Sequence, residues 1–217
     1  MSSRAEKRAE LDQALYGFLD ELDGGRDLHI IGIDEVGRGP LSGPLTVAAV
    51  SLPLSPRISG LNDSKKLSAT RREILSEEIV NIAKSYSIID IEASEIDRIG
   101  IAEAVRLGMT EALNAVVAKT GNPDIVLIDG RPLGVHPAEQ AIIKGDSKVA
   151  CIAAASILAK THRDALMVGF SEEYPCYGWR SNKGYGSAEH IAAIREQGLS
   201  PLHRKTFCRG ILQETLF

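Results

Sequence analysis

The sequence predicts an α/β protein: a mixed β-sheet flanked by helices, followed by a helical C-terminal part. Strand-like runs rich in β-branched residues come first, helices and short apolar runs then alternate, and the last third is helical or loop-rich. The expected strands are residues 28–33, 45–52, 86–91, 124–129 and 141–143. The run at 124–129 is continuously apolar, which is typical of a strand buried on both faces.

The expected helices have apolar residues at helical spacing. They cover residues 3–22, about 69–83, 94–119, a stretch from about 147, and 188–197. Gly24 and Gly25 would end the first helix, and Ser68 is a typical N-cap for the second. We divide the 217 residues into an N-terminal helical extension (1–27), a core (28–165) and a C-terminal helical region (166–217).

Composition and charge argue against a broadly basic polyanion-binding protein, a disulfide-rich secreted protein and a membrane protein. The net charge of −4 gives no global attraction to a polyanion, so any nucleic-acid surface must be a local patch. Three cysteines (Cys151, Cys176 and Cys208) without a C-x-x-C motif indicate structural thiols in a reducing compartment. No apolar run is long enough to span a bilayer, and the N-terminus is unlike a signal peptide. We therefore expect a cytoplasmic protein with no membrane partner.

Carboxylates stand where three expected strands end. Asp34 and Glu35 follow the first strand, Asp129 ends the fourth, and Asp146 follows the fifth. Sites in open α/β sheets lie at the carboxyl ends of strands, and gathered carboxylates repel one another unless cations bind. Four carboxylates can hold two Mg²⁺ or Mn²⁺ ions about 3.5–4 Å apart, which is the geometry of two-metal phosphoryl chemistry.

Each acid also has an ordinary structural explanation. The Asp34-Glu35 pair fits a helix N-cap or a turn beside a loop arginine. Asp129 fits a turn acid before Gly130, and Asp146 fits an N-cap because a helix follows. The recurrence of acids after apolar runs favours the metal site over these separate explanations.

The glycines near residue 37 match no nucleotide-binding motif. Gly37 and Gly39 lack the third glycine of the dinucleotide fingerprint, and Pro40 stands where its helix would begin. These glycines instead allow backbone N–H groups to approach a phosphate or sugar, with Arg38 as a charged clamp. Lys65 and its neighbour Lys66 are a second candidate phosphate contact, or are exposed for solubility.

Positive charge and aromatic residues are concentrated between 174 and 210. Within 175–210, six Lys and Arg residues face two Glu residues, a local charge of 6 − 2 = +4. The aromatic residues are Tyr174, Tyr177, Trp179, Tyr185 and Phe207. This pattern favours a nucleic-acid groove, and a helical subdomain with a solvated basic face is the alternative.

In order along the chain, these segments resemble ribonuclease HII, the type 2 ribonuclease H of bacteria. The resemblance covers about residues 28–207. The matching segments are DEVGRGPLSGP (34–44), NDSKKL (62–67), IDG (128–130), KGDS (144–147), AAASILAK (153–160), RD (163–164), YP (174–175), KGYG (183–186) and HR (203–204). Any one segment is weak, but the ordered set is specific.

The resemblance implies an RNase H-like fold and Mg²⁺- or Mn²⁺-dependent cleavage of the RNA strand of RNA–DNA hybrids. It also implies incision 5′ of a single ribonucleotide in duplex DNA, leaving 3′-OH and 5′-phosphate ends. The catalytic and metal-binding residues carried over are Asp34, Glu35, Asp129 and Asp146. The substrate-binding residues carried over are Gly37, Arg38 and Gly39 at the ribose 2′-OH, Tyr185 at the neighbouring sugar, and Lys65 at the DNA backbone.

The chain departs from the family pattern at three positions. Asn182 stands where the family often has His, Trp179 where it often has Phe, and Thr206 where it commonly has Ser. These departures concern substrate positioning and none of them touches the four acids. Under this resemblance the core (28–165) is catalytic and the region 166–217 binds substrate.

Three rival functions are weighed against a hybrid ribonuclease. A Holliday-junction resolvase is disfavoured by the Gly37–Gly39 segment and Tyr185, and a catalytically silent hybrid-binding protein by the four intact acids. A metal phosphatase is disfavoured by the basic, aromatic C-terminal region.

The last residues form a separate motif. Gln213, Leu216 and Phe217 have the spacing of a sliding-clamp-binding peptide, Gln-x-x-Leu-Phe. A terminal turn that packs on the chain's own core is the alternative.

Overall fold

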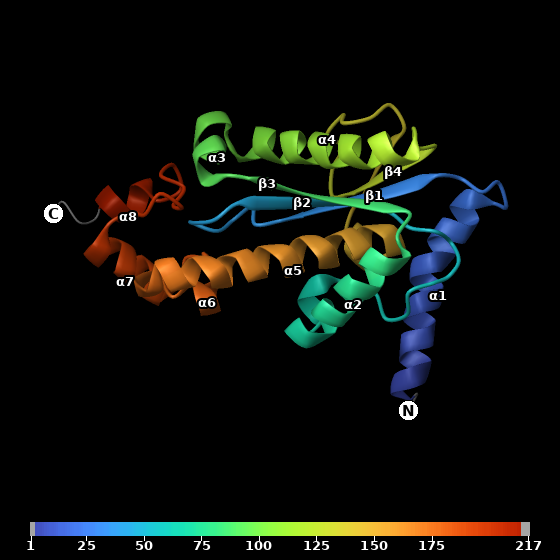
Figure 1. Ribbon diagram of the computed structural model, residues 1–217, viewed down its shortest axis with the longest axis horizontal. Helices are drawn as coiled ribbons and strands as arrows, with labels where there is room; N and C mark the ends of the chain where they lie inside the picture. Colours follow the sequence, from blue (N-terminus) through green and yellow to red (C-terminus); the bar gives the residue numbers. More distant parts are fainter. Residues whose placement is uncertain (1–2, 214–217) are drawn as a thin grey trace.

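The computed structural model describes residues 3–213 and contains one five-stranded sheet with helices on both faces (Figure 1). The strands are β1 (Ile30–Val36), β2 (Leu45–Ser51), β3 (Ser85–Ile91), β4 (Ile125–Asp129) and β5 (Glu139–Ile142). The helices are α1 (Arg4–Asp23), α2 (Ala69–Ile82), α3 (Ala93–Ile99), α4 (Ile101–Thr120), α5 (Ala150–Glu173), α6 (Trp179–Asn182), α7 (Ala188–Gln197) and α8 (Arg209–Gln213). Short 3₁₀ turns cover Ser64–Lys66, Gly145–Ser147 and Pro175–Tyr177.

The sheet is mixed, with strand order β3-β2-β1-β4-β5. β1, β2 and β3 form an antiparallel meander, whereas β4 and β5 run parallel to β1. The register pairs Ile33 of β1 with Ile128 of β4, one residue before Asp34 and Asp129. The carboxyl ends of β1 and β4 therefore bring these two acids to the same edge of the sheet.

Alternation along β1 determines which face each side chain meets. Ile31 and Ile33 pack in the core between the sheet and α4, whereas Ile30 packs on the opposite face, in the core with α5. Gly32 also faces α5, because a Cβ there would lie 2.4 Å from the backbone of Cys151. By the period of two, Asp34 continues the α5 side of the strand.

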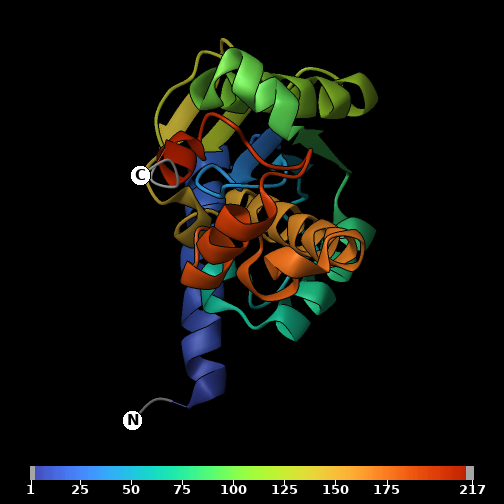
Figure 2. The same cartoon turned by 90° about the vertical axis from the view of Figure 1, so that its left-hand side faces the viewer.

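Helix α5 connects the sheet to the C-terminal part. Its small residues 153–156 are buried and pack closely against β1 and β2. The helix then extends past the sheet, and α6, α7 and α8 gather around its far end (Figures 1 and 2). The expected boundary at residue 165 falls inside α5, so the core and the C-terminal region share one continuous helix.

Four expected elements differ from the structure. The first strand covers 30–36 rather than 28–33, so Asp34 and Glu35 lie within β1 near its end and do not follow it. The single helix expected over 94–119 is two helices, because Gly100 adopts φ 81° and ψ 156° and interrupts it. The last strand covers 139–142 rather than 141–143, and Ile143 is 68% exposed. The helix expected from 147 begins at Ala150, because a 3₁₀ turn precedes it.

Three further expectations concern membrane helices, the cysteines and the C-terminal tail. Within residues 3–213, no helix combines the length and the apolar content that crossing a membrane requires. Cys151 and Cys208 are buried free thiols, and Cys176 is an exposed one. The tail motif of Gln213, Leu216 and Phe217 lies outside the described residues, apart from the backbone of Gln213 at the end of α8.

Candidate active site

One cavity of about 390 Å³ lies at the carboxyl ends of β1 and β4. All nine residues expected from the sequence to act in catalysis or substrate binding line it. They are Asp34, Glu35, Gly37, Arg38, Gly39, Lys65, Asp129, Asp146 and Tyr185. These residues come from five separate parts of the chain, and the fold brings them together.

Asp34 is the most buried of the four acids and is 5% exposed. Its Oδ1 accepts a 2.7 Å hydrogen bond from the N–H of Glu35. Burial raises the pKa of Asp34 well above its usual value, the charges of Glu35 and Asp129 add to the rise, and the Ser156 hydroxyl opposes it. When this buried carboxylate is ionised, a nearby cation is therefore required to offset its loss of solvation.

Glu35 makes one ion pair, in which its Oε1 lies 3.0 Å from Nη1 of Arg38. Its Oε2 is buried and accepts no hydrogen bond within the described chain. Burial raises the pKa of Glu35, and the hydrogen bond and charge of Arg38 oppose that rise. The interpretation of Glu35 as a turn acid beside a loop arginine thus accounts for Oε1, which pairs with Arg38, but not for the buried Oε2.

Asp129 and Asp146 are linked through the backbone between them. Oδ1 of Asp129 accepts a 2.6 Å hydrogen bond from the N–H of Gly145, which precedes Asp146 in the 3₁₀ turn. Burial raises the pKa of Asp146, with contributions from Asp63 and Asp129. The N-cap position of α5 is Val149, so Asp146 does not cap that helix.

The four acids fit hard divalent cations. They offer only oxygen ligands, one of which is the unpartnered buried Oε2 of Glu35. Burial first, and the charges of neighbouring carboxylates second, raise the pKa values of Asp34 and Asp146, and a bound cation would offset both effects. Across residues 3–213, however, no three His, Cys, Asp or Glu side chains form a ready metal cage.

Three polar residues that the sequence reasoning did not single out also line the cavity: Ser64, Ser156 and Lys160. Ser156 and Lys160 are four residues apart on one face of α5, and both fall in the matching segment 153–160. The hydroxyl of Ser156 donates a 3.0 Å hydrogen bond to the hydroxyl of Ser64. For Ser156 and Lys160, helical spacing within a matching segment was the available signal.

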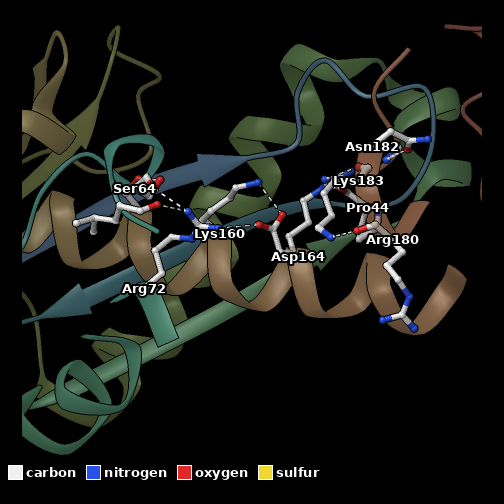
Figure 3. A network of polar contacts seen from close by, with 12 residues as sticks. Pro44, Ser64, Arg72, Lys160, Asp164, Arg180, Asn182 and Lys183 are labelled. Carbon is white, nitrogen blue, oxygen red and sulfur yellow. Dashed lines mark hydrogen bonds and ion pairs between the residues drawn. The ribbon is translucent and has the colours of Figure 1, made fainter. Parts of the chain in front are cut away.

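A network of charges holds the Lys65 turn against α5 (Figure 3). Arg72 donates hydrogen bonds to the carbonyls of Ser64 (3.1 Å) and Leu67 (2.7 Å), on either side of Lys65 and Lys66. The same guanidinium lies 3.2 Å from Asp164 of α5, which also accepts a 2.6 Å hydrogen bond from Lys160. Figure 3 shows these side chains in contact next to the backbone of Ser64. The turn is thus anchored to α5, the helix that contributes Ser156 and Lys160 to the cavity lining.

The expectation of a basic groove lined by aromatic residues is wrong for Tyr177 and Trp179. Trp179 is fully buried, Tyr177 is 5% exposed, and their rings stack 5.1 Å apart in a cluster with His190 and His203. Of this aromatic group, Tyr185 is the exposed member, at 44%, and it reaches the cavity. The late aromatic residues mainly build the C-terminal core, as the alternative interpretation held.

The fold has known counterparts. The ribonuclease H2 of Pyrococcus horikoshii OT3 superposes with a TM-score of 0.72 at 26% identity, over 87% of this chain and 99% of that one. The RNase HII from the PCNA:RNase HII complex of Archaeoglobus fulgidus gives 0.68 at 28% identity, over 82% and 94%. A more distant neighbour, Bst-RNase HIII in complex with Mn²⁺, gives 0.72 at 21% identity, over 87% and 70%. The sheet and its cavity therefore define a nuclease of RNase H-like fold.

Sequence comparison identifies the family within this class of nucleases. The family model for ribonuclease HII matches residues 31–210. Ribonuclease HII of Shouchella clausii is 42% identical over 206 residues, 95% of this chain and 78% of that protein. Ribonuclease HII 1 of Methylibium petroleiphilum is 48% identical over 177 residues, 81% and 88% respectively. The chain belongs to the ribonuclease HII family, and it is a nuclease that hydrolyses the RNA strand of RNA–DNA hybrids.

Proposed function

We propose that this ribonuclease also incises duplex DNA on the 5′ side of a single embedded ribonucleotide, leaving 3′-OH and 5′-phosphate ends. The observation that carries the proposal is the shared cavity, in which the four acids lie beside Gly37, Arg38, Gly39 and Tyr185. A ribose next to the Gly37–Gly39 loop would place its phosphate over the acids. Recognition of one sugar and cleavage beside it then need no long RNA segment.

In this proposal Asp34, Glu35, Asp129 and Asp146 hold two divalent cations, Mg²⁺ or Mn²⁺. Such ions supply an activated water and stabilisation of the leaving oxygen in an in-line displacement at phosphorus. The chain itself contributes the orientation of the ligands. β1 and β4 present Asp34 and Asp129 side by side, and the N–H of Gly145 orients Asp129. The unpartnered Oε2 of Glu35 is the oxygen most in need of a cation.

Substrate binding is assigned to residues on both sides of the acids. The loop at Gly37–Gly39 would contact the ribose 2′-OH, and the exposed ring of Tyr185 would pack on the neighbouring sugar. Lys65, held in its turn by Arg72, would contact a phosphate of the DNA backbone. In this scheme the core (28–165) is catalytic, and Tyr185 is the contribution of the C-terminal region (166–217) to substrate binding. A cytoplasmic location is part of the same proposal.

The decisive experiment uses a DNA duplex with one ribonucleotide, an all-DNA duplex and an RNA–DNA hybrid, each with Mg²⁺, Mn²⁺ or EDTA. The proposal requires a metal-dependent nick 5′ of the ribonucleotide and none in the all-DNA control. Cleavage of the hybrid alone would restrict the enzyme to longer RNA. Cleavage of all-DNA junctions would favour a resolvase, and binding without cleavage a silent binding protein.

A sliding clamp is a second candidate partner. The A. fulgidus relative is known in complex with PCNA, and residues 213–217 of this chain carry the Gln-x-x-Leu-Phe spacing at Gln213, Leu216 and Phe217. A pull-down with clamp protein would compare the full chain with a 1–212 truncation, with hybrid cleavage as the control for folding. Loss of retention on truncation supports the interaction, and equal retention contradicts it.

A further inference from the structure

Two buried arginines lie beneath the loop formed by residues 37–44. Arg163 of α5 and Arg204, which follows α7, are both 0% exposed. In the part of the chain that the structure describes, neither forms an ion pair with a carboxylate. Buried cations without a carboxylate need several good hydrogen bonds, so their partners indicate what these residues are for.

Those partners are backbone carbonyls, and almost all of them belong to this loop. Arg204 donates to the carbonyls of Gly37 (2.6 Å), Arg38 (3.1 Å) and Gly43 (2.9 and 3.1 Å). Arg163 donates to the carbonyls of Pro44 (2.9 Å), Ser42 (3.1 Å) and Lys183 (3.0 Å). The two guanidinium groups thus donate hydrogen bonds to six carbonyls, five of which belong to residues 37–44.

This arrangement determines where the N–H groups of the loop point. A trans peptide holds its C=O and N–H on opposite sides. Because the carbonyls of Gly37 and Arg38 point to Arg204, the N–H groups of Arg38 and Gly39 point away from it. Within residues 3–213 neither of these two N–H groups donates a hydrogen bond, and both residues line the cavity.

The loop can lie this close to the arginines because of its glycines. Gly37 has φ 92°, and a Cβ on it would lie 2.4 Å from Nε of Arg163. Gly43 has φ 82°, and a Cβ on it would lie 2.3 Å from Sδ of Met167 on α5. Any side chain at Gly37 would force the loop off the guanidinium of Arg163.

We propose that Arg204, supported by Arg163, is a positioning residue that presets the N–H groups of Arg38 and Gly39 as a paired donor for a sugar hydroxyl or phosphate oxygen of the substrate. Two positive charges beneath the loop add to the attraction for an electronegative atom. Burial lowers the pKa of Arg204 to about 9, with a contribution from Arg163, so the residue remains charged at pH 7. This inference rests on the proposed reading of a single ribose.

The test is the variant Arg204→Lys, which keeps the charge but cannot bond three carbonyls from one planar fork. The readout is the ratio of the Kd values for the one-ribonucleotide duplex and the all-DNA duplex, measured with Ca²⁺, together with the cleavage rate with Mg²⁺. We expect the preference for the ribonucleotide duplex to fall about tenfold or more. Arg163→Lys should give a smaller loss, because that side chain holds the far half of the loop.

Two controls separate positioning from stability. Arg98→Lys changes an exposed arginine of α3 that pairs with Glu95, and it should leave both Kd values unchanged. Leu75→Ala, on the buried side of α2, should lower the melting temperature and keep the preference for the ribonucleotide duplex. A purely structural role for Arg204 would weaken the binding of both duplexes alike, and an unchanged preference in Arg204→Lys would overturn the proposal.

A measurement on the unaltered protein covers the case in which Arg204→Lys does not fold. Amide exchange at Arg38 and Gly39 should be fast in the free protein and slowed by the one-ribonucleotide duplex more than by the all-DNA duplex. Equal exchange with both duplexes would overturn the proposal. Failure of the unaltered protein to nick the ribonucleotide duplex would instead remove the proposed function on which this inference rests.

Discussion

The N–H of Gly145 lies 2.6 Å from Oδ1 of Asp129 and connects the end of β4 to the turn that carries Asp146. One backbone hydrogen bond thereby sets the relative position of two acids that are 17 residues apart in the sequence (146 − 129). A carboxylate that accepts a backbone N–H is held in one rotamer, which a metal ligand needs. The spacing of these acids therefore depends on a residue that has no side chain of its own.

Replacing Gly145 with valine should displace Asp146. A Cβ at this position would lie 2.5 Å from Cδ1 of Ile152. We expect a stability loss of about 1–3 kcal/mol from overpacking, and a fall in kcat that exceeds what the stability loss explains. Urea unfolding and hybrid cleavage measure the two effects. A Gly169→Val variant is the control, since a Cβ there meets nothing within 4 Å; equal kcat in both variants would contradict the prediction.

Asp34→Asn should abolish cleavage while hybrid binding survives. The amide cannot supply the carboxylate charge that cations require, and we expect a loss of more than about a hundredfold. The melting temperature at pH 7 should stay the same or rise, because a buried charge beside Glu35 and Asp129 is removed. Asp129→Asn should lose cleavage for the same reason. Its amide oxygen can still accept the hydrogen bond from the N–H of Gly145, so the local geometry is kept. Near wild-type cleavage by either variant would refute the metal-site assignment.

Arg38→Ala should weaken the preference for ribose more than it weakens folding. The Arg38 side chain is 59% exposed, so a stability change within about 0.5 kcal/mol is expected. Its backbone N–H remains in place, so the preference should fall less than in Arg204→Lys. The Kd ratio for ribonucleotide and all-DNA duplexes measures the effect, and thermal melting checks the fold. An unchanged ratio would exclude the side chain from sugar recognition.

Arg72→Met should raise KM several-fold and leave kcat nearly unchanged. This side chain touches none of the four acids, but it holds the carbonyls on both sides of Lys65. Its loss frees the turn to move and so weakens a phosphate contact. Arg71→Met is a matched control, because the neighbouring Arg71 donates to the carbonyl of Ser59 instead. Steady-state kinetics on the hybrid decides the question, and the same KM in both variants would disprove the anchoring role.

Stability should decrease as pH falls from about 6.5 towards 4, in part through His203. Burial, with the nearby His190, lowers the pKa of His203 to about 4, whereas an unfolded histidine titrates near 6.5. Its Nδ1 accepts from the N–H of Ser200, so the folded state keeps that nitrogen unprotonated. The unfolded state binds the proton first, so the buried neutral ring contributes fully above pH 6.5. Up to about 3 kcal/mol is lost on acidification.

The variant His203→Asn isolates this effect, since asparagine keeps an acceptor but does not titrate. Urea unfolding of both proteins at pH 7.5 and pH 5 gives the comparison, and carboxylates cancel in the difference. The drop in stability should be smaller in the variant. An equal drop in both proteins would show that His203 is not responsible.

The position of the four acids could be predicted from the sequence, because strand ends and apolar runs are local patterns. Alternation explains why Asp34 turns towards α5, and parallel pairing of β1 and β4 explains why Asp129 joins it. The break at Gly100 was missed, because a glycine inside an amphipathic run is compatible with a continuous helix until its backbone conformation is known.

The burial of each side chain and the identity of its hydrogen-bond partners could not be predicted from local sequence patterns. The same late segment of basic and aromatic residues contains the exposed Tyr185 and the fully buried Trp179, and no periodicity separates them. Arg204 looks like another solvent-exposed cation in the sequence, yet it bonds carbonyls 161 to 167 residues away.

Local sequence patterns are enough to identify the candidate acids near the strand ends, the glycine loop, and the order of segments that places the chain in its family. How these groups are held in place depends on long-range contacts in the fold. The fold buries Arg163 and Arg204 beneath the loop, pairs His190 with His203, and turns Arg72 towards the Lys65 segment. The physical reason is range, because local preferences act over a few residues, whereas burial and hydrogen-bond partners come from contacts between distant parts of the chain.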